Sequence, residues 1–338
     1  MKTRFFNIEK NQPPYLIAEI GLNHNGSLDL ARKTADEALR RGANAVKFQL
    51  YRPELFIAEN AELGNGLSLR EFFRQFTLKE DEWIRLSEHV HSLGMDFFCS
   101  VFDNVSLEFY LESLNPSLIK TASSDFNNRP LIEKAARSGL PLIVSTGASE
   151  DTEVEDLFRW DVDPSRLVLM HCVSSYPASP VDYNLKVLSV WQEKYRCPVA
   201  LSDHTPTETV SAAAVALGAS VIEKHFTLDK NLPGPDQKLS SDPAEFQNLA
   251  RACRDSFESL GSGVKRCMNS EMPVREFGRR ALYALKDIKK GDIFTEENII
   301  PLRPGGNPGM EDYSKILGKK APLDYQKGDR LNNALPEV

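Results

Sequence analysis

The chain has 338 residues, of which 41% are hydrophobic and 26% charged, an ordinary composition for a soluble globular protein. Its net charge of −7 speaks against a general nucleic-acid or membrane-surface binder, although a local cluster of Lys and Arg would still accept an anionic substrate. The N-terminal stretch holds no long apolar run, and the five cysteines are widely spaced without a CxxC pair. These features predict no signal peptide or membrane anchor, and free thiols in a reducing cytoplasm.

Short apolar, β-rich runs alternate with amphipathic helical stretches through the first three quarters of the chain. The predicted strands are residues 15–21, 45–51, 96–102, 118–124, 141–147, 167–173, 198–204 and 220–226. Predicted helices between and after them include residues 28–41, 79–93, 207–217 and 243–260. Such alternation is typical of parallel βαβ units, and eight units of roughly 31 residues approach the length of a (β/α)8 TIM barrel. An open doubly wound sheet is the alternative, which the lack of a GxGxxG fingerprint after the first strand disfavours.

The alternation of apolar strands and amphipathic helices ends after residue 260. Residues 261–280 have the basic, irregular character of a linker, and residues 281–338 offer short strands and turns. Lys290, Gly291 and Asp292 suit a hairpin-type turn, and a loop rich in Pro and Gly follows at 304–309. We therefore expect a barrel over residues 1–260, a linker over 261–280 and a small β-rich domain over 281–338.

Polar residues late in an apolar strand are candidates for the active site, because barrel enzymes carry their chemistry at the carboxyl ends of the strands. Side chains alternate along a strand, so Glu223 and His225 share one face while Lys224 points to the helix layer or the rim. Further polar residues close other predicted strands or follow them directly: Glu19, Lys47, Gln49, Lys120, Ser123 and Ser145.

Two of these strand ends carry histidines, His204 and His225. Adjacent strands lie only about 5 Å apart, so the two imidazoles can share a divalent ion such as manganese, iron, cobalt or zinc. The alternative is that both are hydrogen-bonded core histidines. Lys47 and Lys120, near turns rich in Ser and Thr, indicate an anion site, with lysines that extend from the rim into solvent as the alternative.

A series of motifs follows in the order seen in sialic acid synthases: "AEIGLNHNG", "AVKFQ", "KTASSDFNN", "STG", "HCVSSYP", "LSDHT" and "IEKHFTLD…PGPD". The tail "DIKKGDIFTEENIIPLRPGG…LGKKA" is similar to the antifreeze-like (SAF) domain of that family, a β-clip fold. Each motif alone is a weak signal. The whole series, in register over essentially the entire chain, is a specific one.

The resemblance implies a synthase that condenses phosphoenolpyruvate with N-acetylmannosamine or a related 2-acetamido sugar, giving a nine-carbon sialic acid and phosphate. By family position, His204 and His225 would hold a manganese-type ion, with magnesium or cobalt as alternatives, that polarises the sugar aldehyde. Glu19 matches a carboxylate placed to move the proton of the attacking water. Six residues match positions that hold phosphoenolpyruvate: Lys47, Asn65, Ser100, Lys120, Ser123 and Ser145.

The sugar site and the assembly are also implied by the resemblance. Five barrel residues match positions that shape the sugar site: Gln49, Asp125, Tyr176, Glu223 and Asp236. Arg303 matches an Arg of the small domain that reaches the barrel of a neighbouring subunit, which implies a domain-swapped homodimer. The chain departs from the usual pattern where Ser100 replaces Thr, where "PGPDQ" lacks a His, and in the "RPGGNPG" loop. The last two departures bear on the identity of the sugar.

Other functions remain open from the sequence. A synthase for legionaminic or pseudaminic acid, or for a spore-coat polysaccharide, would apply the same chemistry to a 6-deoxy diacetamido sugar. A 3-deoxy-sugar-phosphate synthase would need further basic residues for the phosphate of its substrate. A non-catalytic sugar-binding homologue would have no need for Glu19, Lys47, Lys120, His204 and His225 together.

Overall fold

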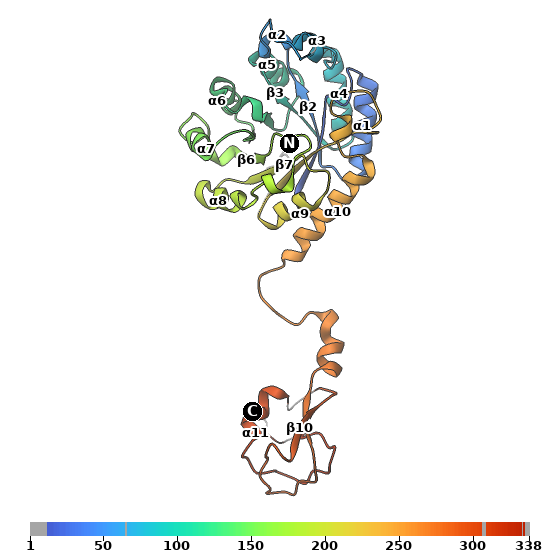
Figure 1. Ribbon diagram of the computed structural model, residues 1–338, viewed down its shortest axis with the longest axis vertical. Coiled ribbons are helices and arrows are strands. Elements are labelled where there is room, and N and C mark those ends of the chain that lie inside the picture. Colours follow the sequence, from blue (N-terminus) through green and yellow to red (C-terminus); the bar gives the residue numbers. More distant parts are fainter. Residues whose placement is uncertain (1–11, 65, 306–308, 333, 335–338) are drawn as a thin grey trace. The chain divides into compact units, whose positions relative to one another are not determined.

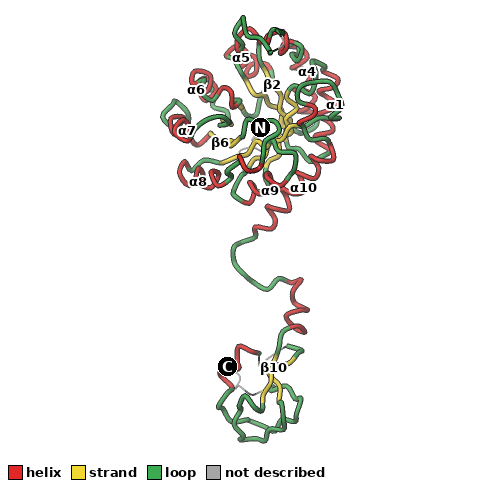
Figure 2. Tube along the Cα trace, viewed as in Figure 1, coloured by secondary structure: helices red, strands yellow, loops and turns green. Residues whose placement is uncertain are grey.

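The computed structural model describes residues 12–64, 66–305, 309–332 and 334. The chain divides into two compact units, one that runs to Gly261 and one that begins at Ser262. Figures 1 and 2 show the larger unit as a ring of strands enclosed by helices. Among the described residues, no helix is both long and apolar enough to cross a membrane.

The larger unit is built on a closed parallel barrel. Each strand pairs with the next one along the chain, and β8 pairs with β1 to close the ring. The strands are β1 (Tyr15–Gly21), β2 (Ala45–Leu50), β3 (Asp96–Val101), β4 (Ile119–Thr121), β5 (Leu142–Ser145), β6 (Leu167–Cys172), β7 (Val199–Asp203) and β8 (Val221–His225). The predicted (β/α)8 fold is confirmed, and the open doubly wound sheet is excluded.

Helices follow the strands and cover the outside of the ring (Figure 1). They are α1 (Leu28–Arg40), α4 (Glu80–Ser92), α5 (Asn104–Ser113), α6 (Arg129–Arg137), α7 (Asp151–Leu157), α8 (Lys186–Tyr195), α9 (Thr209–Ala216) and α10 (Pro243–Leu260). Capping side chains fix their starts: Ser27 accepts a hydrogen bond from the third residue of α1, and Asp242 accepts two from the first turn of α10. Two short helices, α2 (Pro53–Phe56) and α3 (Leu69–Arg74), lie in the connection between β2 and α4.

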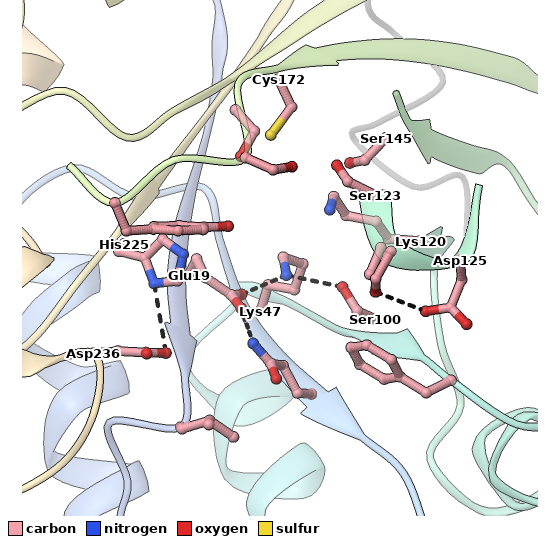
Figure 3. Close-up of a pocket in the computed structure, with 18 of the residues that line it drawn as sticks. Glu19, Lys47, Ser100, Lys120, Ser123, Asp125, Ser145, Cys172, His225 and Asp236 are labelled. Carbon is pink, nitrogen blue, oxygen red and sulfur yellow. Dashed lines mark hydrogen bonds and ion pairs between the residues drawn. The ribbon is translucent and has the colours of Figure 1, made fainter. Parts of the chain in front are cut away.

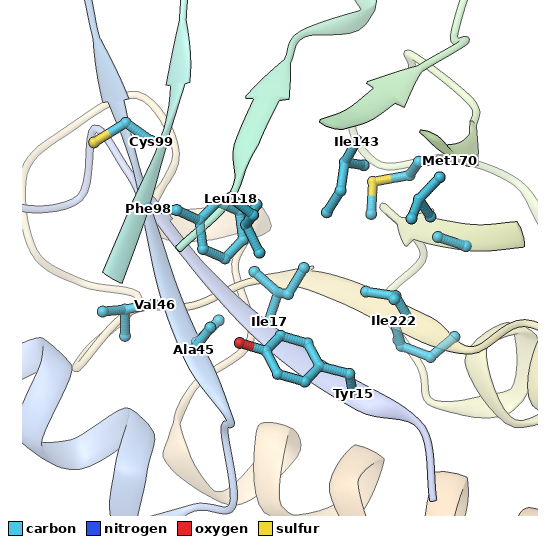
Figure 4. Packing of buried hydrophobic residues seen from close by; sticks show 14 of the residues in the cluster. Tyr15, Ile17, Ala45, Val46, Phe98, Cys99, Leu118, Ile143, Met170 and Ile222 are labelled. Atoms are coloured by element: carbon cyan, nitrogen blue, oxygen red, sulfur yellow. The ribbon is translucent and has the colours of Figure 1, made fainter. Parts of the chain in front are cut away.

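An apolar layer lies directly beneath the polar strand ends inside the barrel. Five of the polar residues have a buried apolar side chain two positions earlier: Ile17 before Glu19, Ala45 before Lys47, Phe98 before Ser100, Leu118 before Lys120 and Ile143 before Ser145. Figure 4 shows Ile17, Phe98 and Leu118 pointing toward one another. Side chains of this layer fill the barrel as a packed core, so the polar ends above them form the floor of a site.

The second unit is small and β-rich. Strands β9 (Ala281–Ala284) and β10 (Ile299–Leu302) pair antiparallel, and a short helix α11 (Tyr313–Ile316) follows. A turn forms at Lys290–Asp292 as predicted, but it does not close a hairpin. The residues on either side of the turn pair with other segments instead of with each other: Ile288 forms a β-bridge with Tyr325, and Ile293 forms one with Lys320. Buried Leu282, Ile288 and Phe294 give this unit its own core.

Candidate active site

The carboxyl ends of the barrel strands meet around a cavity of about 730 Å³. Thirteen of the fifteen predicted site residues line it: Glu19, Lys47, Gln49, Ser100, Lys120, Ser123, Asp125, Ser145, Tyr176, His204, Glu223, His225 and Asp236. These residues are scattered over more than two hundred positions of the chain, and the parallel strands deliver them to one end of the barrel. The structure thus brings the predicted residues into one site, and their individual roles stay predictions.

Two predicted residues fall outside this cavity lining. Asn65 lies outside the described residues. Arg303 belongs to the second unit, directly after β10, where its side chain is exposed. The loop that carries it is fastened to neighbouring residues, because Arg280 Nη1 donates to the carbonyl of Pro301 at 3.0 Å and the Tyr283 hydroxyl donates to that of Pro304 at 2.9 Å.

Four buried charged residues form the floor of the cavity, and Figure 3 labels three of them, Glu19, Lys47 and Lys120. Lys47 Nζ lies 2.6 Å from Glu19 Oε2 and 3.8 Å from Glu223 Oε2, and it donates a hydrogen bond to Ser100 Oγ at 2.9 Å. Lys120 Nζ lies 3.5 Å from Glu223 Oε1. None of these four charged side chains is more than 5% exposed. The floor is therefore an alternating network of two cations and two anions that is shielded from water.

The environment sets the proton affinity of each of these groups. Burial raises the pKa of Glu19, and the adjacent Lys47 offsets that rise only in part. Burial would also raise the pKa of Glu223, but Lys120 and Lys47 outweigh it and bring the pKa below its ordinary value. Burial lowers the pKa of Lys120 despite the attraction of Glu223. Two carboxyls in one site thus have pKa values shifted in opposite directions, a pattern common in acid–base catalysis.

Serine hydroxyls surround the lysines on the β3–β5 side of the cavity. Ser123 Oγ accepts a hydrogen bond from the backbone N–H of Gly147 at 3.0 Å. Ser145 is 1% exposed, and its Oγ has no hydrogen-bond partner among the described residues. Figure 3 shows Ser123 and Ser145 near Lys120. A buried hydroxyl without a partner beside a buried cation is a donor suited to an anionic ligand.

His204 and His225 lie on the β7–β8 side of the cavity. Their ring centroids are 5.4 Å apart, and the ring of Tyr176 packs 4.1 Å from that of His204. His204 Nδ1 is 2.7 Å from the carbonyl of Val173, which leaves Nε2 toward the cavity near Ser202 Oγ at 3.3 Å. Burial, with His204 and Lys47 nearby, lowers the pKa of His225 far below its ordinary value, and its buried Nδ1 has no hydrogen-bond partner within the described part of the chain.

These two histidines suit a divalent ion by their donor chemistry. The two imidazoles come from neighbouring strands, and the ring of His225 is neutral with a nitrogen that is free to bind a metal. Imidazole is a common ligand for divalent transition-metal ions. Asp236 Oδ2 is 3.9 Å from His225 Nδ1, too far for a hydrogen bond. Within the residues that the structure describes, no group of three or more His, Cys, Asp or Glu side chains forms a ligand cluster.

The "NHNG" motif at 23–26 does more than turn the chain after β1. Buried Asn23 Nδ2 donates to the carbonyl of Phe226 at 2.9 Å and to Ser240 Oγ at 2.8 Å. Gln237 Nε2 returns a hydrogen bond to the carbonyl of Asn23 at 3.0 Å. The loop after β1 therefore fastens the loop after β8, which carries Asp236 to the edge of the cavity.

Sequence reasoning missed an apolar wall of the cavity. Most of it comes from the connection between β2 and α4, and one residue each follows β1 and β3: Leu22, Phe56, Ile57, Ala58, Ala61, Leu69, Phe73 and Phe102. Phe56, Phe73 and Phe102 also pack around Tyr51. Their spacing matches neither a strand nor a helix, so no periodic signal marked them as one surface.

Four polar residues of the lining were also missed: Ser124, Cys172, Ser174 and Ser202. Strand alternation could have found Ser202, which stands two residues before His204, and its Oγ donates to Glu223 Oε1 at 3.1 Å. Cys172 Sγ lies 3.9 Å from His204 Nδ1. Burial would raise the pKa of this thiol, but the contact with His204 outweighs it and lowers the pKa.

Comparison with known proteins identifies the family. The family model described as the NeuB family matches residues 34–265. The chain belongs to the NeuB family. A second model, the SAF domain, matches residues 279–332. This NeuB-family chain therefore combines the family's barrel with the small domain that its tail resembled.

Named relatives of this NeuB-family chain include enzymes for several nonulosonic acids. An N,N'-diacetyllegionaminic acid synthase of Legionella pneumophila is 37% identical over 94% of this chain and 93% of the relative. A pseudaminic acid synthase of Campylobacter jejuni is 35% identical over 97% of this chain and 98% of the relative. The crystal structure of an N-acetylneuraminic acid synthetase from Leptospira borgpetersenii superposes with a TM-score of 0.69 at 34% identity, covering 78% of this chain and 90% of that one.

Proposed function

We propose that the protein is a synthase that condenses phosphoenolpyruvate with an N-acylated amino sugar to give a nine-carbon 2-keto acid and phosphate. The observation that carries this proposal is that two sides of one cavity bear different kinds of side chain. Buried lysines and hydroxyls lie on the β2–β5 side, and two histidines lie on the β7–β8 side. Family membership supports a synthase, and the division supports one anionic and one carbonyl-bearing substrate.

Phosphoenolpyruvate would bind on the lysine side. A trianionic ligand needs fixed cations and hydroxyl donors, and Lys47, Lys120 and Ser145 supply them without competition from water. Glu19 and Glu223 neutralise the two lysines when no ligand is bound. An anion that enters therefore replaces carboxylate partners that are already in place, and the lysines stay ionised and oriented.

The amino sugar would bind between the histidines and the mouth of the cavity. We include in the proposal a divalent ion held by His204 and His225, manganese first and magnesium or cobalt as alternatives. Such an ion, when bound, polarises a carbonyl oxygen as a Lewis acid. Gln49, Tyr176 and Asp236 also line the cavity and would orient the hydroxyl and amide groups of the sugar.

Glu19 would move the proton of the attacking water. Water addition to the former enol carbon requires a proton acceptor, and loss of phosphate then leaves the ketone. Burial raises the pKa of Glu19, which makes its carboxylate a better base than an exposed glutamate. Before an anion binds, Gln49 Nε2 lies 3.4 Å from Glu19 Oε1 and Lys47 Nζ lies 2.6 Å from Oε2, so both oxygens are held in place.

A 6-deoxy diacetamido sugar is the second candidate acceptor, against N-acetylmannosamine. The apolar wall that includes Phe56, Ile57 and Phe73 favours this sugar. Its methyl group and second acetyl group could be buried against the wall, whereas a hydroxyl there would be left without a hydrogen-bond partner. The legionaminic and pseudaminic acid synthases among the relatives support the same acceptor class. The Leptospira structure supports the N-acetylneuraminate alternative.

A substrate panel tests the proposal. The purified protein would be incubated with phosphoenolpyruvate, Mn²⁺ and each candidate sugar, scoring phosphate release and product mass. We expect phosphate release that depends on one acylamino sugar and a product with the mass of the corresponding nonulosonic acid. Sugar-independent phosphate release, or no turnover with the whole panel, would contradict the proposal. The Lys120→Met variant serves as the control for contaminating phosphatase.

A further inference from the structure

A second buried ion pair lies behind the two histidines, on the outer face of the barrel strands. Asp203 ends β7, and Lys224 is its register partner on β8. Lys224 Nζ lies 3.1 Å from Asp203 Oδ2, with side-chain exposures of 4% and 0%. Ser211 of α9 donates to the same Asp203 oxygen at 2.6 Å. The pair thus sits between the strands and the helix layer, outside the cavity described above.

Both Asp203 and Lys224 form hydrogen bonds with the loop that follows His204. Asp203 Oδ1 accepts hydrogen bonds from the backbone N–H and the hydroxyl of Thr205, each at 2.8 Å. Lys224 Nζ donates to the carbonyl of Thr205, and also to that of Thr207 at 3.3 Å. In the chain, His204 therefore lies between Asp203, a member of the pair, and Thr205, which the pair holds by hydrogen bonds. His225 directly follows Lys224 on the strand.

We propose that Asp203 and Lys224 are positioning residues, which fix His204 and His225 relative to each other from behind the strands. The inference rests on the proposed function in which these histidines act together. It also accounts for three titratable residues in a row at Glu223–His225, since Lys224 belongs to a network of its own on the opposite face of the strand.

A contribution to folding stability does not by itself explain why a buried ion pair is found here. Desolvation of two buried charges offsets much of their attraction, and an apolar pair of similar volume is often as stable. The hydrogen bonds to Thr205 and Thr207 are what an apolar pair would not supply. They hold the backbone on the C-terminal side of His204, while the Tyr183 hydroxyl accepts from its backbone N–H at 2.7 Å.

The test is a double variant, Asp203→Asn with Lys224→Met, in the full-length protein. A single Lys224→Met change would leave a buried carboxylate uncompensated and risk unfolding. The double variant keeps an amide oxygen for Thr205 but removes both charges and the donor to the two carbonyls. Lys134→Met is the matched control, because it removes an ion-paired lysine at the surface, 2.5 Å from Glu108.

Four measurements separate positioning from general support of the barrel. We expect the double variant to keep its melting temperature and its affinity for phosphoenolpyruvate, while its affinity for Mn²⁺ alone, titrated by electron paramagnetic resonance, falls about 10- to 100-fold. Imidazole resonances of His204 and His225 in ¹H–¹⁵N spectra should shift or broaden. The Lys134→Met control should match the parent in every measurement.

Parental Mn²⁺ affinity together with unchanged imidazole resonances would overturn the inference. A parallel loss of melting temperature and phosphoenolpyruvate affinity would overturn it too, since the pair would then support the whole barrel. Failure of the proposed function is distinguishable, because it would appear as a parent protein that turns over no sugar. The imidazole spectra decide the positioning role in either case, even for a parent that binds no Mn²⁺.

Discussion

Lys47 Nζ and Glu19 Oε2 lie 2.6 Å apart on adjacent barrel strands, and both side chains are buried. This contact couples the anion site to the proposed base. Lys47 opposes the burial that raises the pKa of Glu19. An anionic substrate that draws Lys47 away from Glu19 therefore makes the carboxylate a stronger base when the substrate is in place.

The pH dependence of turnover follows from this coupling. Glu19 must be ionised to accept a proton, so kcat/KM should fall as the pH drops through its raised pKa. The acid limb of the profile should therefore lie above pH 4.5, the ordinary value for a glutamate. Glu19→Gln should remove most turnover and, with it, this limb. A profile that stays flat down to pH 4.5, or a limb that survives in the variant, would contradict the assignment.

Lys120 provides the sharpest test of the anion site. Lys120→Met removes one buried charge while keeping most of the side-chain volume. We expect the Kd for phosphoenolpyruvate, measured by calorimetry without sugar, to rise about 10- to 100-fold, as loss of a charge-assisted hydrogen bond predicts. Lys194→Met, which removes a surface ion pair with Glu155, is the control. Unchanged affinity in Lys120→Met would make Lys120 a rim residue.

His225 tests the divalent ion. Because none of the described residues forms a hydrogen bond with its buried Nδ1, His225→Ala removes a ligand without breaking a hydrogen bond at that atom. We expect chelation to abolish turnover of the parent, Mn²⁺ to restore it, and the variant to bind Mn²⁺ more weakly. His171→Ala is a poorer control, since His171 Nε2 is 2.5 Å from the Tyr183 carbonyl. His89→Ala, at the surface beside Asp36, is the better one. Full activity in chelator would exclude the metal.

The fold and the floor of the site were predictable because strands impose a strict alternation. An apolar run that ends in a polar residue gives both the strand and the direction of that residue, as for Glu19, Lys47 and His225. In a parallel barrel all such ends meet at the same face. Local sequence order therefore determined which distant residues lie together, without any knowledge of the packing.

The walls of the site were not predictable in the same way. Phe56 and Phe73 come from the two short helices between β2 and α4, where the path of the chain depends on tertiary packing around Tyr51. The turn at Gly291 was predicted, whereas the partners of its flanking residues were not. Ile288 pairs with Tyr325 and Ile293 with Lys320, and pairing between segments so far apart in the chain leaves no periodic trace in the sequence.

His24 should make stability depend on pH. It is buried between Phe48 and Trp83, and burial lowers its pKa to about 4 from 6.5. The unfolded chain thus takes up this proton first, and stability should fall by about 3 kcal/mol as the pH drops from above 6.5 toward 4. Urea unfolding at pH 8 and pH 4 measures the decline. The His24→Phe variant should show a smaller decline, and an equal decline in both proteins would refute the role of His24.

The last prediction concerns the second unit and its arginine. We propose that Arg303 contacts the sugar in the barrel of a partner subunit, in a domain-swapped homodimer. Arg303 is exposed, and its loop is fastened by Arg280 and Tyr283, so the guanidinium projects from a held backbone. A guanidinium presents a planar fork of donors suited to the hydroxyl and amide oxygens of a sugar. Arg303→Ala should raise the KM for the sugar and leave phosphoenolpyruvate affinity unchanged.

Subunit mixing decides whether the arginine acts across subunits. At a sugar concentration well below the raised KM of Arg303→Ala, the Arg303→Ala and Glu19→Gln homodimers should each be nearly inactive, because every site lacks one residue. In a mixed dimer, the barrel of the Arg303→Ala subunit keeps Glu19 and receives Arg303 from its partner, so one of the two sites is intact. Activity should therefore recover after exchange of subunits, which native mass spectrometry of differently tagged chains verifies. Exchange without recovery would mean that Arg303 acts within its own chain or takes no part in catalysis.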